Sequence, residues 1–299
     1  MHILYTELNM TKIVETGYGK INLALAITGR RADGYHNIDT IFQSIGLADT
    51  ITLEESDSFA LTCSTGSLAC DRTNLAYRAW QALCPYKKDN LGVHIHLEKR
   101  IPIAAGLAGG STDCAAVLRG LNRLWQLHLT ETELCRLGAS LGADVPFCIC
   151  GGTMRGTGIG EELRPLPNLP EWPVLIVHPH AAVVTKKAYA LFDEKKETAP
   201  VAVDAVEAAV RCGDFDALLA AMGNTFEELV IPDVPEAAQC QQLLKSAGLR
   251  PLMAGSGPTF FALVPHEREG EVRRQAASWT DVDTYMTKAV HGAEGGVNE

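Results

Sequence analysis

Two hydrophobic periodicities divide the chain into strand-like and helix-like segments. Apolar residues alternate with other types over Lys20–Thr28, which favours a half-buried strand. Runs of the same kind predict short strands over residues 47–53, 58–63, 93–97, 174–178 and 259–264. The segment Gly29–Asn37 is rich in turn-forming and charged residues and predicts a loop.

Helical spacing replaces this alternation in several segments. Residues 75–83 predict one helix, and a longer one follows residue 111, where Ser111, Thr112 and Asp113 suit an N-cap or first turn. Apolar residues of this longer helix recur at three- and four-residue spacings: Val117, Leu118, Leu121, Leu124 and Trp125. Another helix is expected after the capping box of Thr130 and Glu133, ending at Gly142. Residues 185–247 are mostly helical and acidic in pattern.

Alternating strand-like and helix-like segments indicate an α/β protein. A length of 299 residues suggests two domains or one large domain. The proline-rich stretch Pro165–Pro173 is a candidate linker, so we expect domains over residues 10–164 and 165–299. No internal repeat is visible.

Composition narrows the class of protein. The formal net charge of −10 argues against a general affinity for nucleic acid, although a local cluster can still bind a small anion. The nine cysteines form no C-x-x-C pair, which argues against a zinc finger and favours a reducing compartment. No membrane span or secretory signal is recognisable, so we expect a soluble, cytoplasmic protein. Residues 1–11 resemble a short tail, and translation could start at Met1 or Met10.

The most informative stretch is the glycine-rich segment Ile101–Asp113. Its glycines, Gly106, Gly109 and Gly110, precede hydroxyl residues that open a helix. Backbone N–H groups without side chains around them can approach a bulky anion, and a helix N-terminus favours negative charge. The segment therefore fits a phosphate cradle, although it matches neither the P-loop nor the dinucleotide pattern. A tight strand-to-helix turn with no ligand is the alternative.

Two further segments place polar groups where chemistry could occur. In K-I-N-L, Lys20 and Asn22 share one strand face. In L-G-A-D-V-P-F, Asp144 lies in an apolar setting, where a carboxylate must be hydrogen-bonded, ion-paired or catalytic. Taken alone, an aspartate such as Asp144 is more often a satisfied cap or turn residue than a catalytic one. The turn M-A-G-S-G-P-T, at residues 253–259, could form an anion-binding nest before the strand at 259–264.

Other candidate residues have simpler explanations. His94 and His96 share a strand face, as do His178 and His180, but neither pair has a third metal ligand nearby in sequence. Cys114 is interpreted as a core residue. The acidic run over residues 193–197 is most simply a solvated helix end.

In this order, the motifs resemble the GHMP kinase superfamily of small-molecule kinases. The resemblance rests on Lys20–Leu23, G-R-R-A-D-G-Y-H at residues 29–36, the loop at 101–112, L-G-A-D-V-P-F with G-G-T at 151–153, G-I-G-E at 158–161 and G-S-G-P-T at 255–259. The segment at residues 29–36 points to the branch that acts on diphosphocytidyl methylerythritol. This branch belongs to the non-mevalonate route to isoprenoid precursors.

The resemblance implies a fold and a reaction. The N-terminal domain would resemble domain 2 of ribosomal protein S5, the C-terminal domain would be ferredoxin-like, and the active site would lie between them. The reaction would transfer the γ-phosphoryl group of ATP to the 2-hydroxyl of 4-diphosphocytidyl-2-C-methyl-D-erythritol. Asp144 would act as general base, and Lys20 would keep that carboxylate ionised and polarise the alcohol.

The resemblance also implies binding residues. The ATP phosphates would lie against Pro102, Ile103, Ala104, Ala105, Gly106, Leu107, Ala108, Gly109, Gly110, Ser111 and Thr112. Mg²⁺ would bridge phosphate oxygens, with Ser111 as a possible contact. The substrate would contact Asn22, Tyr35, His36, Thr185 and Tyr189, although core packing is an equal explanation for Tyr189. A second phosphate loop would comprise Gly255, Ser256 and Gly257.

Departures from the family pattern are modest. Tyr18-Gly19 replaces a Pro-Ala pair before Lys20, and Ala108 replaces a glycine, adding a methyl group beside the phosphates. Two rival functions remain open: another kinase of the superfamily, of the homoserine or mevalonate type, and a binding protein that kept the fold and lost catalysis. The presence of both Lys20 and Asp144 argues against the second rival.

Overall fold

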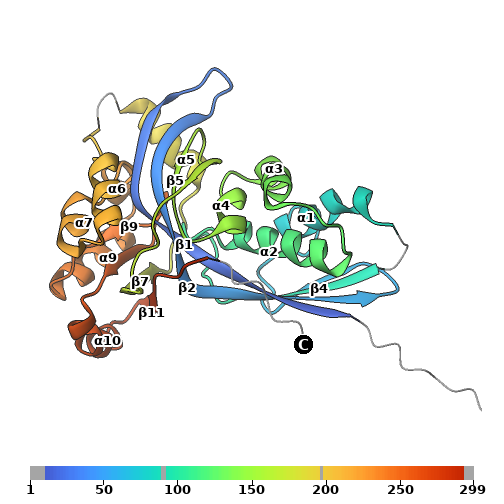
Figure 1. Cartoon of the computed structure of the whole chain (residues 1–299). Coiled ribbons are helices and arrows are strands. Elements are labelled where there is room, and N and C mark those ends of the chain that lie inside the picture. Colours follow the sequence, from blue (N-terminus) through green and yellow to red (C-terminus); the bar gives the residue numbers. More distant parts are fainter. Residues whose placement is uncertain (1–10, 89–91, 196–197, 293–299) are drawn as a thin grey trace, which may run out of the picture.

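Two β-sheets with helices packed on them form the protein (Figure 1). The computed structural model describes residues 11–88, 92–195 and 198–292. One sheet has seven strands and the other has four within these ranges. The alternative start sites Met1 and Met10 lie outside the described residues.

The longest elements are two antiparallel strands, β1 (Lys12–Arg30) and β2 (His36–Ser56), which run along most of the molecule (Figure 1). The loop predicted over residues 29–37 is shorter than expected, because Arg30 still pairs with His36 in the ladder. The strand predicted from Lys20 is accordingly one part of a much longer strand. Register shifts at Tyr18/Gly19 and after Asn22 interrupt β1 on both sides of Lys20.

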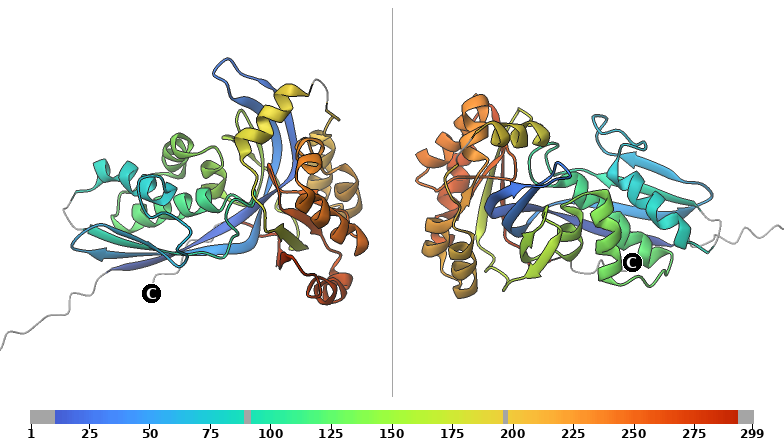
Figure 2. Two further views of the ribbon diagram at one scale, coloured as in Figure 1. Left: turned by 180° about the vertical axis from the view of Figure 1, so that it is seen from behind. Right: turned by 90° about the horizontal axis from the view of Figure 1, so that it is seen from above.

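The larger sheet carries its helices on one face, as Figures 1 and 2 show. Its strand order is β3-β4-β2-β1-β8, with β5 paired to β2 and β6 to β5. Its remaining strands are β3 (Ala60–Cys63), β4 (Gly92–Glu98), β5 (Thr153–Thr157), β6 (Glu162–Pro165) and β8 (Gly223–Asn224). Its helices are α1 (Leu75–Leu83), α2 (Gly109–Leu124), α3 (Glu131–Leu141) and α4 (Val145–Cys150).

The apolar faces of the strands and helices explain how these helices pack on the sheet. Alternate residues of β4, such as Ile95 and Leu97, are fully buried and belong to the same cluster as Leu118 and Leu121 of α2. Burial of such side chains contributes roughly 1.5–3 kcal/mol each. The predicted helix over residues 75–83 and the capping box of Thr130 are confirmed. The helix α2 begins earlier than residue 111, at Gly109 with Ala108 as its N-cap, so Ser111 and Thr112 are first-turn residues, as one of the two predicted alternatives had it, and not N-caps.

The smaller sheet is antiparallel and has the order β11-β7-β10-β9. Its strands are β7 (Pro173–Pro179), β9 (Leu252–Met253), β10 (Phe260–Leu263) and β11 (Val282–Lys288). Every residue of β7 is buried, because one face of the strand packs on β1 and β2 and the other on helices. The strand β11 was not expected, because only the first of its seven side chains is buried.

Helices of the C-terminal half surround this smaller sheet (Figure 2). They are α5 (Thr185–Glu194), α6 (Val203–Cys212), α7 (Phe215–Ala221), α8 (Glu227–Val230), α9 (Pro235–Ser246) and α10 (Glu269–Ala276). Short 3₁₀ turns occur at Cys84–Tyr86, Ile231–Asp233 and His266–Arg268. None of the helices within the described ranges is long and apolar enough to cross a membrane.

Segments from the N-terminal and C-terminal halves of the chain pair in one sheet and pack in one hydrophobic cluster. The strand β8 pairs in parallel with β1 through Ala24 and Leu25, so a C-terminal segment extends the larger sheet. Ala289 forms an isolated bridge with Ile45 of β2. One hydrophobic cluster contains residues of β1, β2, β7 and α6. A division of the chain at residues 164 and 165 stays a prediction.

Candidate active site

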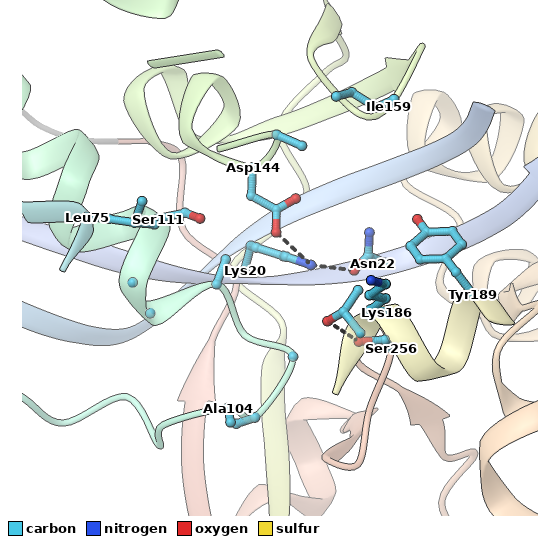
Figure 3. A pocket seen from close by; sticks show the side chains of 18 of the residues that line it. Lys20, Asn22, Leu75, Ala104, Ser111, Asp144, Ile159, Lys186, Tyr189 and Ser256 are labelled. Carbon is cyan, nitrogen blue, oxygen red and sulfur yellow. Dashed lines mark hydrogen bonds and ion pairs between the residues drawn. The ribbon is translucent and has the colours of Figure 1, made fainter. Parts of the chain in front are cut away.

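A cavity of about 1230 Å³ lies where the hairpin, the glycine loop and the C-terminal half meet (Figure 3). Most of the residues predicted to bind or react line it. Its walls come from β1, the β1–β2 turn, the loop before α2, the turn before α4, the helix α5 and the turn after β9. Residues distant in sequence therefore converge on one space.

Lys20 is a buried residue of the cavity wall, and Asn22, two residues further along β1, holds its side chain in place. Its Nζ donates to Oδ1 of Asn22 at 2.8 Å, as the shared strand face predicted. Asn22 in turn donates from Nδ2 to Oγ1 of Thr40 at 2.8 Å, and Thr40 donates to the carbonyl of Ala24 at 2.6 Å. Because Thr40 accepts the amide N–H, the carbonyl oxygen of Asn22 faces Lys20. The chain of hydrogen bonds orients the ammonium group.

Asp144 lies opposite Lys20, as Figure 3 shows. The distance from its Oδ2 to Nζ of Lys20 is 3.8 Å. Asp144 is the N-cap of the short helix α4, but its side chain accepts no capping hydrogen bond there. The Lys20 side chain is 5% exposed and that of Asp144 is 34% exposed, so the carboxylate reaches the open cavity. The carboxylate is therefore ion-paired and free of a capping role.

The glycine loop is fixed against both halves of the molecule. The backbone N–H of Lys20 donates to the carbonyl of Leu107 at 3.1 Å, which ties the loop to β1. Gly106 has a φ of 76°, and a Cβ there would lie 2.2 Å from the carbonyl oxygen of Ala254. Gly106 is thus required for a close approach to the C-terminal turn, a role distinct from the anion contact that its sequence suggested.

The N-terminus of α2 opens onto the cavity. The backbone of its N-cap, Ala108, has the left-handed conformation with a φ of 61°, and the side chain makes no capping hydrogen bond. Gly109, Gly110 and Ser111 begin the helix and line the cavity. The amides of a first helical turn have no acceptor one turn earlier, and the helix dipole favours an anion there. This geometry suits a phosphate group.

A buried ionic cluster links the two ends of the loop, and sequence reasoning missed it. Nζ of Lys99 is bonded to carboxylate oxygens of Asp49 and Asp113, the latter at 2.6 Å. Asp49 also accepts from the backbone N–H of Arg100 and of Ile101, at 2.6 and 2.9 Å. The only sequence signal was a lysine two residues before the loop and an acid directly after it. The cluster fixes the residue where the loop begins.

Asp113 is the unusual member of this cluster. Burial raises its pKa to about 7, against the opposing effect of the Lys99 ammonium. Within the part of the chain that the structure describes, its Oδ1 is buried and has no hydrogen-bond partner. Both Asp113 and Lys99 line the cavity.

The hairpin turn and helix α5 form the far wall. Tyr35 is 61% exposed at the turn and lines the cavity. His36 is buried and stacks on Tyr189, with ring centroids 4.8 Å apart and an interplanar angle of 16°. Tyr189 also meets Phe226 edge-on, so it both packs in the core and faces the cavity.

The turn at residues 255–257 closes the cavity from the C-terminal side. Ser256 and Thr185 are bonded through their hydroxyl groups, whose oxygens are 2.9 Å apart. The carbonyl of Gly255 accepts from Asn224 at 2.8 Å, which holds the turn in place. Gly257 leaves no room for a side chain, since a Cβ there would lie 2.6 Å from Sδ of Met253.

Three predicted residues do not line the cavity. Leu107 is buried, and Thr112 donates its hydroxyl to the carbonyl of Tyr18 at 2.6 Å. Gly257 is the third. Among the described residues, no group of three or more His, Cys, Asp or Glu side chains could hold a metal ion. His94 and His96 both contact Thr62 instead, and Cys114 is fully buried in the core.

Comparison with known proteins gives the class of protein. The family model for the GHMP kinases N terminal domain matches residues 74–152, and that for the GHMP kinases C terminal matches residues 202–280. A homoserine kinase from Cytophaga hutchinsonii has the same fold, with a TM-score of 0.72 over 99% of each chain and 18% identity. The fold is that of the two-domain GHMP kinases.

More similar relatives refine this assignment. The 4-diphosphocytidyl-2-C-methyl-D-erythritol kinase of Moorella thermoacetica is 44% identical over 87% of this chain and 92% of its own length. That of Enterococcus faecalis is 40% identical over 84% of this chain and 90% of its own. The crystal structure of a 4-(cytidine 5′-diphospho)-2C-methyl-D-erythritol kinase matches with a TM-score of 0.79 and 33% identity, covering 94% of this chain and all of its own.

The chain belongs to the GHMP kinases, a class of phosphotransferases, and within them to the family of 4-diphosphocytidyl-2-C-methyl-D-erythritol kinases.

Proposed function

We propose that this protein transfers the γ-phosphoryl group of ATP to the 2-hydroxyl of 4-diphosphocytidyl-2-C-methyl-D-erythritol, in the non-mevalonate route to isoprenoid precursors. The observation that carries the proposal is the pairing of Lys20 with Asp144 at 3.8 Å inside the cavity that the glycine loop also lines. Relatives at 40–44% identity carry the name of this activity.

In the proposed step, Asp144 takes the proton of the attacking hydroxyl group. The substrate oxygen forms a bond to the γ-phosphorus, the bond from that phosphorus to the β,γ-bridging oxygen breaks, and ADP leaves. The Lys20 ammonium, oriented by Asn22, stabilises negative charge on the attacking oxygen. General-base assistance of this kind contributes roughly 10²–10⁴-fold to a rate.

The loop at residues 102–111 and the first turn of α2 would hold the ATP phosphates through backbone N–H groups. The turn with Gly255 and Ser256 would contribute from the other side. Tyr35, His36, Thr185 and Tyr189 would bind the cytidine end of the substrate.

The residues present fit a Mg²⁺ ion that is held mainly by phosphate oxygens. Such an ion needs only one or two oxygen ligands from the protein, and the Ser111 hydroxyl at the cavity wall is one such donor. The ion would neutralise charge on the phosphate oxygens.

We also infer a small-molecule enzyme without a nucleic-acid partner, in keeping with the net charge of −10. A cytoplasmic location stays a prediction from the nine cysteines, all of which are free.

The test is ATP turnover with and without 4-diphosphocytidyl-2-C-methyl-D-erythritol, beside homoserine and mevalonate at the same ATP concentration. We expect ATP turnover with the cytidyl substrate and none with homoserine or mevalonate. Turnover with homoserine or mevalonate would favour a different kinase of the class. Absence of turnover with all three would favour a binding protein on the same fold.

A further inference from the structure

Helix α5 presents one face to the cavity, and a carboxylate lies at its far end. Thr185, Tyr189 and Asp193 are four residues apart, so they lie on the same side of the helix, and all three line the cavity. The acidic run that includes Asp193 was predicted to be a solvated helix end. Asp193 does lie at the exposed end of α5, but its side chain is only 29% exposed and is also bonded to the hairpin, which the sequence did not indicate.

Asp193 contacts both strands of the hairpin at the base of its turn. Its Oδ1 lies 2.7 Å from Nε2 of His36, and its Oδ2 lies 3.4 Å from Nη1 of Arg30. A carboxylate can only accept, so Nε2 of His36 must carry the hydrogen. Only Nδ1 of the imidazole is then left for another partner.

The His36 ring has little freedom to move. One face stacks on Tyr189, and the edge of the ring meets Phe192 with centroids 5.7 Å apart at 89°. Its side chain is 5% exposed. Stacking restricts tilting of the ring, whereas the bond to Asp193 fixes which ring nitrogen faces the helix. The two contacts together define one orientation.

The same carboxylate sets the position of the turn. Arg30 and His36 face each other in the β1–β2 ladder, on either side of the turn that carries Tyr35. Within the turn, Asp33 accepts from Arg31 and from the backbone N–H of Tyr35, at 3.0 and 3.1 Å. The turn is therefore braced by its own hydrogen bonds, and its base is bonded to α5 through Asp193.

We propose that Asp193 is a positioning residue that fixes His36 and the Tyr35 turn for recognition of the cytosine base, and thereby helps this enzyme to distinguish cytosine from uracil. The inference rests on the proposed function, in which these two residues bind the cytidine end. Cytosine and uracil differ in the donors and acceptors on their edges, so a ring fixed in one orientation can discriminate between them, whereas a freely flipping ring cannot.

The experiment compares D193A and D193N with E194Q, which removes the same charge from the next residue of α5. Glu194 is exposed and does not line the cavity. Binding of CDP and of UDP is measured by calorimetry, together with KM for each substrate, kcat and the melting temperature. Asparagine keeps the size of Asp193 but loses the attraction to Arg30, so D193N also serves if D193A folds poorly.

We expect CDP to bind about tenfold more weakly to D193A, and less weakened to D193N, because charge-assisted hydrogen bonds contribute about that much. UDP binding should change less, so the ratio of the affinities for CDP and UDP becomes smaller. In both Asp193 variants, the KM for ATP and kcat should stay within about twofold of the unsubstituted enzyme. In E194Q, CDP binding, UDP binding, both KM values and kcat should all stay within the same range.

Two results would overturn the inference. The first is CDP binding within about twofold of the unsubstituted enzyme in both Asp193 variants. The second is an equal loss of CDP and UDP binding accompanied by a raised KM for ATP, which indicates general damage to the site. If the unsubstituted enzyme neither binds CDP nor phosphorylates the cytidyl substrate, the proposed function itself is refuted.

Discussion

Lys20 and Asp144 come from a strand and a helix end that are 124 positions apart in sequence, yet Nζ of the lysine lies 3.8 Å from Oδ2 of the aspartate. The lysine is buried and the aspartate is partly exposed, so the positive charge lies beneath the negative one and the carboxylate faces the cavity. This order suits a base that receives a proton from a bound alcohol while its charge is supported from below.

Replacing Lys20 by methionine tests the supporting charge. K20M keeps most of the side-chain volume but removes the ammonium group that pairs with Asp144 and accompanies the developing alkoxide. We expect kcat to fall by about 10² or more, with KM for ATP little changed. K12M, at the exposed start of the same strand, is the matched control and should retain normal turnover. Normal turnover by K20M would remove Lys20 from the mechanism.

The hydrogen-bond chain behind Lys20 can be broken at Thr40. T40V is close to isosteric, but it leaves Nδ2 of Asn22 and the carbonyl of Ala24 without the hydroxyl they share. A buried polar group without a partner costs about 1–3 kcal/mol. Chemical denaturation should show a loss of this size in T40V, with a lower kcat because Asn22 no longer orients Lys20. T40S keeps the hydroxyl and should lie nearer the unsubstituted protein; equal behaviour of T40V and T40S would show that the hydroxyl has no such role.

A methyl group at Gly106 tests the contact between the loop and the C-terminal turn. In G106A, the new Cβ would lie 2.2 Å from the carbonyl oxygen of Ala254, at a φ of 76° that alanine adopts poorly. We expect a loss of about 2 kcal/mol or more in unfolding free energy, together with weaker ATP binding. For folding, G110A is the comparison, because its Cβ would meet only Leu75, at 3.8 Å. Equal melting temperatures for the two variants would contradict this packing.

The raised pKa of Asp113 predicts a pH dependence of stability. Burial raises this pKa to about 7 in the folded protein, so between pH 4 and 7 the unfolded chain releases a proton that the folded protein retains. The free energy of unfolding should therefore fall as pH rises through this range, relative to D113N, which cannot titrate there. Urea unfolding of both proteins at about pH 5 and about pH 8 measures the effect. A difference between the two proteins that is independent of pH would show that the pKa of Asp113 is not raised.

Local patterns in the sequence predicted those parts of the fold that depend on nearby residues. The capping box of Thr130 and Glu133 and the face shared by Lys20 and Asn22 are set by spacing alone, and both are found. The edge strand β11 escaped prediction because its pairing with β7 places it in the sheet, while its own residues are mostly half-buried or exposed and show no clear apolar alternation.

The unexpected parts of the site depend on contacts between distant segments. The bond of Asp193 to His36 spans 157 positions, and the pairing of Lys99 with Asp49 spans 50. No periodicity links such residues. For Asp193, the spacing of four from Tyr189 was the available signal, and the acidic composition of its surroundings hid it.

The most direct test of the account is the turnover number of D144N with ATP and 4-diphosphocytidyl-2-C-methyl-D-erythritol. Asparagine keeps the size of Asp144 but cannot accept the proton, so kcat should fall by about 10²–10⁴ while CDP and ATP bind almost normally. D57N, an exposed substitution outside the cavity, should match the unsubstituted enzyme. Because Lys20 and Asp144 act as a unit, the double variant K20M/D144N should be far less impaired than the product of the two single effects. A D144N enzyme that loses stability and ATP affinity but keeps its turnover number would show that Asp144 is a structural residue and that the base lies elsewhere.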